Sequence, residues 1–348
     1  MCLYLLFNKE ELLRSWIKYN LIFKQWAVKG SMIFMVLFFA SDHVFGQQPY
    51  TFNLYMFSPM IINPGYTGSH DVFTITGQAR MQWVGIPGAP RSASISGSSP
   101  LKKSNAALGG YINSESYGVT NRTGINFSYA YKIKLRPRTG GLHNRGRGQG
   151  IGTLSMGLSG GFDLRSSRWS EINTSNPDID DPVFTFDTGT LFEPNFGFGL
   201  FFNNDKFYAG FSVPRLLQYS DNPEEQTTQL SARVTEMAYY LNGGVLLVLS
   251  NEVKLRPSTL LKWTPHGTFQ AELNTNFIFN DIFTIGLTYR TTKTALVLAQ
   301  FYISRQFSLG YAYEYSFNDL AGFSSGSHEF MLQYEFGFNV RTTNPRYF

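Results

Sequence analysis

The sequence predicts an all-β protein: a transmembrane antiparallel β-barrel of about fourteen strands, with a short N-terminal plug or lead-in segment. Only 15% of the 348 residues are charged, whereas soluble globular proteins have roughly 25%. The chain is 16% aromatic and contains 33 glycines. After residue 46 it has no apolar run of about 20 residues, which a membrane-spanning helix would need. With a mean hydropathy of -0.15, this combination is typical of a membrane barrel.

Residues 1–46 are expected to form an N-terminal extension plus a cleavable signal peptide. Lys29-Gly30-Ser31 precedes the apolar run 32–40, and the small Gly46 offers a cleavage point. The stretch before Met32 is long and apolar for a signal peptide, so Met32 is a possible true start. A retained anchor is the alternative, but an apolar core of about nine residues is too short to span a bilayer. The mature chain is therefore expected to begin near Gln47.

Removal of this segment changes the chemistry available to the mature protein. Cys2 is the only cysteine, so disulfides, thiolate metal sites and a cysteine nucleophile would all be excluded. The segment also carries five basic and three acidic side chains, so the net charge falls from +5 to +3. Because this excess is small, we do not expect a nucleic-acid partner.

Alternation with a period of two runs through the mature chain. Between Thr268 and Phe279 one parity is mainly apolar and aromatic, and the other carries Gln270, Glu272 and Asn274. The same split recurs at 73–83, 125–131, 309–315 and 330–336. A soluble β-sandwich would also alternate. Here, however, the apolar parity is rich in Tyr and Phe, as lipid-facing girdles are, and the other is polar and mostly uncharged, as a lumen would be.

The strands are expected to be long and joined by tight turns. The candidate ranges are 72–84, 91–98, 106–114, 122–134, 151–163, 192–202, 205–213, 228–241, 243–250, 253–263, 268–279, 282–290, 294–303, 306–316 and 327–337. Bacterial barrels of one chain have even strand numbers, so we expect one of these ranges to be a plug or loop piece. Asn203-Asn204-Asp205 and Asn280-Asp281 have the residues that tight hairpin turns require.

Two segments do not follow the pattern of alternating strands and short turns. Residues 47–70 are apolar and interrupted by prolines, which fits either a plug in the mouth of the barrel or a periplasmic lead-in; residues 71–348 are expected to form the barrel. Residues 136–150 are basic and rich in glycine, which indicates a loop. The chain ends in Phe348, and a terminal aromatic residue resembles the assembly signal of outer-membrane barrels.

Catalysis and metal binding have weak support. The five histidines form no His-Glu-x-x-His pair, and no Gly-x-Ser-x-Gly elbow is present. Ser327-His328 beside Glu329 is the best candidate for a hydrolase site, although a surface-loop histidine is the simpler interpretation. The acidic stretch 176–182 lacks the glycine and distal glutamate of an EF-hand loop. We therefore expect no enzyme activity, no cofactor and no metal site.

Several stretches resemble the PorP/SprF family of type IX secretion system outer-membrane proteins. The most specific are 55–69 (YMFSPMIINPGYTGS) and 80–90 (RMQWVGIPGAP). Further agreement lies at 123–131, 194–199, 206–214 and 344–348. Gly65 stands where the family often has alanine, and 136–150 looks like an insertion.

The resemblance implies a Bacteroidota envelope protein: an outer-membrane accessory component of type IX secretion that supports secretion and surface attachment of adhesin-type cargo, and gliding in some relatives. The implied partners are periplasmic ring components, a peptidoglycan-binding lipoprotein, the C-terminal domain of a secreted adhesin and outer-membrane lipid. The alternative is a plugged barrel transporter for a small hydrophobic solute, because Asn63-Pro64-Gly65 also resembles the plug of fatty-acid barrels. An outer-membrane hydrolase is the third possibility.

The residues expected to dock partners or to form the plug fall into two groups. They are Asn63, Pro64, Gly65 and Gly68, and then Gln82, Trp83, Gly85, Pro87, Gly88 and Pro90. The prolines of the loop 84–92 restrict its conformations, so it would lose little entropy when a partner binds. Turn formation and packing are the alternative roles of these residues.

Overall fold

The computed structural model describes residues 52–102, 104–135, 151–171, 187–222, 227–231, 237–265 and 269–337. All of them belong to one compact unit, Gly46–Phe348. The predictions for residues 1–46, for the basic loop 136–150, for the acidic stretch 176–182 and for Phe348 lie outside the described residues.

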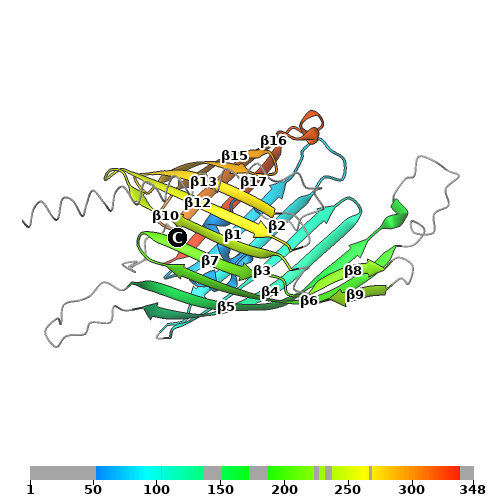
Figure 1. Cartoon of the computed structure of the whole chain (residues 1–348), viewed down its shortest axis with the longest axis horizontal. Helices are drawn as coiled ribbons and strands as arrows, with labels where there is room; N and C mark the ends of the chain where they lie inside the picture. The colour runs from blue at the N-terminus through cyan, green and yellow to red at the C-terminus, as the bar shows by residue number, and fades with distance from the viewer. Residues whose placement is uncertain are drawn as a thin grey trace, which may run out of the picture. The chain divides into compact units, whose positions relative to one another are not determined.

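Fourteen antiparallel strands close into a barrel, in which strands that follow one another in the chain pair with one another (Figure 1). Closure comes from the pairing of β1 with β17 and of β10 with both β7 and β12. The strands are β1 (Phe73–Met81), β2 (Arg91–Pro100), β3 (Ala106–Tyr117), β4 (Thr120–Leu135), β5 (Gly152–Ser167), β6 (Thr188–Asn203), β7 (Phe207–Val213), β10 (Tyr239–Val245), β12 (Val253–Trp263), β13 (Phe269–Phe279), β14 (Phe283–Arg290), β15 (Thr294–Tyr302), β16 (Phe307–Ser316) and β17 (Ser327–Phe336).

Three short strands stand outside this ring. The strand β11 (Leu247–Val248) extends the edge that β10 forms with β12. The strands β8 (Gln218–Asn222) and β9 (Thr227–Ser231) pair only with each other, as a hairpin between β7 and β10. None of the helices among the described residues is long and apolar enough to cross a membrane.

The predicted fold class is confirmed, with one correction to the strand ranges. Residues 228–241 do not form one strand, because 227–231 belongs to the β8–β9 hairpin and the barrel strand begins at Tyr239. That strand continues through Asn242 to Val245, so the predicted break between 241 and 243 is wrong, and 243–250 is not a separate strand. Both glycines pair with β7 and β12, and a methyl group at Gly244 would press on Tyr208 and Ser258. The two glycines thus lie inside β10 and permit close packing there.

The two faces of the barrel follow the predicted alternation. Large apolar side chains such as Phe127 (68% exposed) and Leu287 (60% exposed) point outward, where lipid would cover them. Their neighbours Ser128 and Thr288 are buried in the lumen. Closure leaves no unpaired sheet edge in the hydrocarbon, where each unsatisfied backbone group would cost several kcal/mol.

The barrel has two distinct rims. The terminal rim, where β1 begins and β17 ends, carries several short turns, such as 204–206 and 280–282. In the latter turn Asn280 and Asp281 have φ of 50° and 56°, as the hairpin prediction required. The opposite rim, here the loop rim, carries the connections 82–90, 214–238 and 317–326. The strands β4, β5 and β6 have 16 residues each, more than the about ten that cross a membrane.

Residues 52–69, here the lumen segment, pack inside the ring. They form three single turns of 3-10 helix: η1 (Tyr55–Phe57), η2 (Pro59–Ile61) and η3 (Pro64–Tyr66). Leu54 and Tyr55 share a core cluster with Leu260 of β12, Leu298 of β15 and Met331 of β17. The wall side chains of this cluster come from β10 to β17, and the segment also approaches the opposite wall at Gly157 of β5 and Gly199 of β6, so it fills the lumen from one side to the other.

We predict that the outer face tolerates no charge at mid-height. Leu287 lies near the middle of β14 and faces outward, so Leu287→Arg should destabilise the folded barrel by about 2–4 kcal/mol. Equilibrium unfolding by urea in lipid vesicles measures this. Ile303→Arg, in a turn of the terminal rim, is the control and should have little effect; equal losses for the two variants would contradict the assigned membrane face.

Candidate functional site

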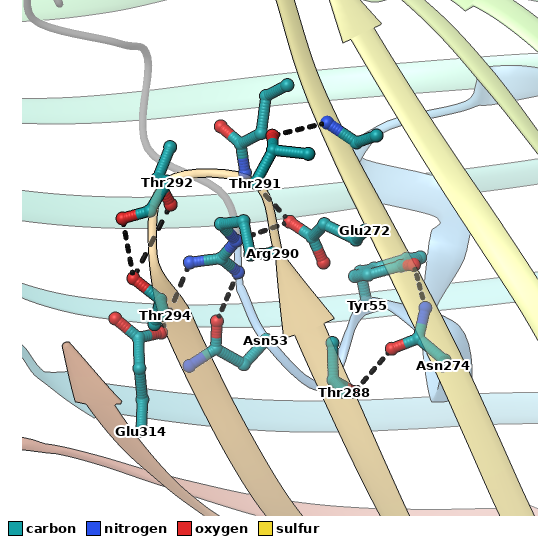
Figure 2. A network of polar contacts seen from close by, with 12 residues as sticks. Asn53, Tyr55, Glu272, Asn274, Thr288, Arg290, Thr291, Thr292, Thr294 and Glu314 are labelled. Atoms are coloured by element: carbon teal, nitrogen blue, oxygen red, sulfur yellow. Dashed lines mark hydrogen bonds and ion pairs between the residues drawn. The ribbon is translucent and has the colours of Figure 1, made fainter. Parts of the chain in front are cut away.

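Asn53 lies at the centre of a group of charged side chains from four strands. Its amide oxygen accepts hydrogen bonds from Arg80 of β1 and Arg290 of β14, each 2.9 Å long. The carboxylate of Glu329 on β17 accepts the backbone N–H groups of Asn53 and Leu54, at 2.7 and 2.9 Å. Figure 2 shows Asn53 beside Arg290, with Glu314 of β16 close by. We call Asn53, Arg80, Arg290, Glu314 and Glu329 the Asn53 latch.

The charges of the Asn53 latch also pair with one another. The carboxylate of Glu314 forms ion pairs with Arg80, at 3.0 Å, and with Arg290, at 3.3 Å. Arg290 also forms an ion pair with Glu272 of β13, at 2.8 Å. All of these side chains are buried, so removing one partner would leave an unpaired charge away from water, at a cost of about 3–5 kcal/mol. The latch therefore fixes one end of the lumen segment and ties together strands on both sides of the closure between β1 and β17.

Glycines in the wall make room for Asn63-Pro64-Gly65. Gly157 of β5 pairs with Gly199 of β6, and Gly210 lies on β7. A methyl group at Gly157 would overlap the backbone of Pro64, and one at Gly199 would overlap the side chain of Asn63. We call these three glycines the glycine seat. Without them the segment could not lie against this wall.

Hydrogen bonds hold the segment on the glycine seat. The amide nitrogen of Asn63 donates to the carbonyl of Leu200 at 3.0 Å, while its amide oxygen accepts the N–H of Gly65 at 2.8 Å and begins η3. The hydroxyl of Ser212 on β7 donates to the carbonyl of Ile62 at 2.6 Å. The side chain of Asn63 thus both shapes the turn and binds the wall.

The segment leaves the lumen near the terminal rim. Gly68 has φ of 63° and approaches Ala107 so closely that no side chain fits there, and its carbonyl accepts a hydrogen bond from Lys132. The hydroxyl of Thr67 donates to Ser128 at 2.9 Å. Since the Asn53 latch lies near the strand ends at the loop rim, residues 53–68 run along the lumen from one rim to the other.

The predicted docking loop is fixed to a neighbouring loop at the loop rim. The N–H of Val84 donates to the carbonyl of Gly326 at 2.8 Å, and the N–H of Ser325 donates back to the carbonyl of Val84 at 2.8 Å. Trp83, Gly85 and Gly88 adopt positive φ, which turns the loop over the end of the sheet. We call residues 82–90 and 317–327 the rim platform.

The rim platform presents aromatic side chains to its surroundings. Phe323 is 77% exposed and Phe317 is 59% exposed. Gly88 also accepts the N–H of Gly118, from the turn between β3 and β4, at 2.8 Å. The backbone of the platform is therefore held in place while its apolar side chains are free to contact another molecule.

A second ionic group stabilises the taller strands near the loop rim. Arg122 of β4 and Arg165 of β5 bind Glu193 of β6 at 2.8 and 2.7 Å. Asp163, also on β5, pairs with Arg122 at 3.4 Å and with Arg215. These pairs face the lumen and connect β4, β5 and β6 where the wall is tallest.

The predicted site residues thus separate into two places. Asn63, Pro64, Gly65 and Gly68 lie in the lumen, whereas Gln82, Trp83, Gly85, Pro87, Gly88 and Pro90 lie on the rim platform. The Asn53 latch and the glycine seat were missed. Charged residues and glycines at inward positions of the alternating strands are the signals that could have found the wall residues of both groups.

The hydrolase candidate does not assemble. Ser327 is buried in the lumen and accepts the N–H of Trp83, while His328 points outward and pairs with Tyr311 at 2.8 Å. The carboxylate of Glu329 accepts the backbone N–H of Asn53 in the Asn53 latch. Consecutive residues of a strand face opposite sides, so Ser327 and His328 cannot act on one substrate. The described residues also contain no group of acidic, histidine and cysteine side chains suited to a metal ion.

Comparison with known protein families shows to which family the chain belongs. Residues 44–334 match the family described as type IX secretion system membrane protein PorP/SprF. The chain belongs to the PorP/SprF family. With its closed ring and apolar outer face, this PorP/SprF protein is an outer-membrane β-barrel. It is thereby a membrane component of the type IX secretion system.

Solved barrels resemble this PorP/SprF protein at low identity. Omp33 of Acinetobacter baumannii is 7% identical with a TM-score of 0.42, over 78% of this chain and 100% of that chain. The KdgM porin is 12% identical with a TM-score of 0.33, over 76% and 99%. A mutant of the Rh. blastica porin is 8% identical with a TM-score of 0.32, over 76% and 99%. Comparison with curated proteins finds no match.

We predict that the glycine seat is required for the lumen segment to dock in this PorP/SprF barrel. Gly157→Ala and Gly199→Ala should each destabilise the folded barrel by about 1–3 kcal/mol, because the added methyl group overpacks the segment. Gly77→Ala is the matched control, since a methyl group there meets nothing within 4 Å. Urea midpoints in vesicles make the comparison, and three equal midpoints would show that the seat is not required.

A second prediction concerns the Asn53 latch. Asn53→Leu removes the acceptor shared by Arg80 and Arg290, and a hydrogen bond to a charged group contributes about 1.5–3 kcal/mol. We expect the lumen segment to become sensitive to protease in the detergent-solubilised barrel while the strands stay intact. Asn121→Leu, on the outward face of β4, should leave the segment protected. Protection of both variants would exclude the latch as the anchor.

Proposed function

We propose that this barrel is an accessory component of type IX secretion that supports secretion and surface attachment of adhesin-type cargo by docking partners on its rims. The observation that carries the proposal is the contrast between a filled lumen and a fixed, exposed rim platform. A lumen filled by its own chain offers no passage to a folded protein. The rims are then the surfaces at which partners can bind.

The rim platform supports the docking of a partner. Its backbone is held by reciprocal hydrogen bonds between Val84 and the 325–326 segment, so binding would order few additional residues. Exposed aromatic side chains such as Phe323 are the groups that most often dominate protein interfaces. A loop on a rigid frame with exposed aromatic residues has the properties of a docking surface.

The two rims suit two kinds of partner. Outer-membrane barrels place short turns in the periplasm and longer loops outside the cell. By that rule the rim platform lies at the cell surface, where the C-terminal domain of an adhesin would bind. The terminal rim then faces the periplasm, where ring components and a peptidoglycan-binding lipoprotein would bind. A role in gliding would follow from attachment of a motility adhesin.

The alternative, a transporter for a small hydrophobic solute, makes a different demand. A solute would have to displace Asn63-Pro64-Gly65 from the glycine seat, where the wall and the segment are already in contact. Uptake of a hydrophobic solute that is lost on deletion of the gene would favour this alternative.

We predict that the exposed aromatics of the rim platform bind the cargo. Phe317→Ser together with Phe323→Ser should strongly reduce capture of an adhesin C-terminal domain by the tagged barrel in native pull-downs from solubilised outer membranes. Periplasmic components should still co-purify, because they would use the other rim. The readout is quantitative mass spectrometry of the bound proteins.

The matched control is Ile303→Ser, an exposed apolar residue in a turn of the terminal rim. It should leave adhesin capture unchanged. If the wild-type barrel is isolated with neither an adhesin nor periplasmic components, the accessory role is wrong. If adhesin capture survives the double substitution, the rim platform is not the docking surface.

A further inference from the structure

The rim platform stands on the ends of the two strands that close the ring. Residues 82–90 continue from β1, and residues 317–327 lead into β17. The ladder between these strands ends one pair beyond Arg80 and Glu329, which face each other across it. Both residues belong to the Asn53 latch. The latch and the platform are therefore separated by one step of the ladder.

The lumen segment holds Glu329 more closely than Arg80 does. The carboxylate of Glu329 accepts the N–H groups of Asn53 and Leu54 at 2.7 and 2.9 Å, whereas the guanidinium of Arg80 is 3.9 Å away. The side chain of Glu329 is fully buried, and a buried carboxylate depends on its hydrogen bonds. Withdrawal of the segment would remove the two shortest of them. The end of β17 below the platform is therefore stabilised by the segment.

Asn53 also binds the opposite strand of this pair. Its amide oxygen accepts a hydrogen bond from the guanidinium of Arg80 on β1, 2.9 Å away. One residue of the segment thus bridges two facing residues of the ladder, with its side chain bound to β1 and its backbone bound to β17. The latched segment therefore fixes the spacing of the two strand ends that carry the rim platform.

Hydrogen bonds between the two parts of the platform depend on this spacing. The N–H of Trp83 donates to the hydroxyl of Ser327, the first residue of β17, at 3.2 Å. Beyond it, Val84 donates to Gly326 and accepts from Ser325, each at 2.8 Å. Since such hydrogen bonds are about 2.7–3.2 Å long, a small separation of the strand ends would break them. The exposed aromatic side chains of the platform would then lose their fixed backbone.

We propose that Asn53 is a positioning residue for the rim platform, and that a partner docks there most strongly while the lumen segment is latched. This inference rests on the docking function proposed above. Asn53 is 3% exposed, so it acts on a partner only through Arg80 and Glu329. Because coupling between two sites is reciprocal, a partner bound to the platform in turn holds the segment in the lumen. Occupancy of the lumen thereby regulates the docking surface.

The first measurement needs no partner. Hydrogen–deuterium exchange with mass spectrometry follows the backbone amides of the rim platform in the detergent-solubilised full chain. Asn53→Leu should speed their exchange by about five-fold or more, as expected for coupled sites. Exchange of β5, which has no residue in the latch, should not change, whereas a general loss of structure would speed exchange in both places.

Ser212→Ala is the matched control. It removes the hydrogen bond from Ser212 to the carbonyl of Ile62 in the lumen segment and leaves the latch intact, so the platform should exchange as in the wild type. If Asn53→Leu does not fold, Glu329→Gln takes its place. A glutamine has the same shape but one acceptor oxygen for the two N–H groups, so the platform should again exchange faster.

The second measurement is capture of an adhesin C-terminal domain in the native pull-down. Asn53→Leu, with Phe317 and Phe323 intact, should lower capture by about five-fold or more, and Ser212→Ala should not lower it. In the wild-type barrel, a bound adhesin domain should slow the cleavage of the lumen segment by protease.

Unchanged exchange of the platform in a folded Asn53→Leu barrel would overturn the positioning role, and so would faster exchange with undiminished capture. A wild-type barrel that captures no adhesin domain would instead show that the docking function is wrong. The exchange measurement would still decide whether Asn53 positions the platform.

Discussion

The structure depends on one electrostatic constraint: a charged side chain enclosed between the barrel wall and the lumen segment has to be paired. The Asn53 latch meets this constraint for four strands at once, because Asn53 offers an oxygen to two arginines and backbone N–H groups to Glu329. Departure of the segment would remove the hydrogen bonds that Asn53 and Leu54 make to Arg80, Arg290 and Glu329. Closure of the barrel and retention of the segment are therefore coupled, since Arg80 and Glu329 lie on the two strands that close the ring.

The glycine seat meets a different constraint, that of volume. A barrel of this size has room for side chains or for a polypeptide segment, and the wall has to be thin where the backbone of the segment approaches it. Gly157, Gly199 and Gly210 lie on three adjacent strands and have no side chain, so the segment can approach the wall there. Asn63 provides the hydrogen bonds that make the contact specific. Charge holds the segment at the loop-rim end, and close packing with hydrogen bonds holds it in the middle.

The alternation of residues predicted the fold because lipid and lumen impose opposite chemistry on successive residues of every strand. It failed between residues 228 and 250, where the predicted strands 228–241 and 243–250 are replaced by the hairpin strand Thr227–Ser231 and the barrel strand Tyr239–Val245. The plug was left open between two interpretations, because nothing in 47–70 itself says that it lies in the lumen; its partners, such as Glu329, are far away in the chain. Asn53 could not be found from the sequence for the same reason, whereas the loop 84–92 was recognisable from its own prolines and glycines.

The wall that surrounds the lumen segment is not uniform. Around most of the ring the segment meets side chains that match it in size or charge, from Leu260 and Met331 to the glycine seat. Along β1 and β2 it meets a row of small hydroxyl groups, of which Ser96 contacts Ser58 of the segment at 3.3 Å. Closure of the lumen toward large molecules depends on the charged and glycine contacts, and Arg80 of the Asn53 latch lies beside Ser92 at the loop-rim end of this row.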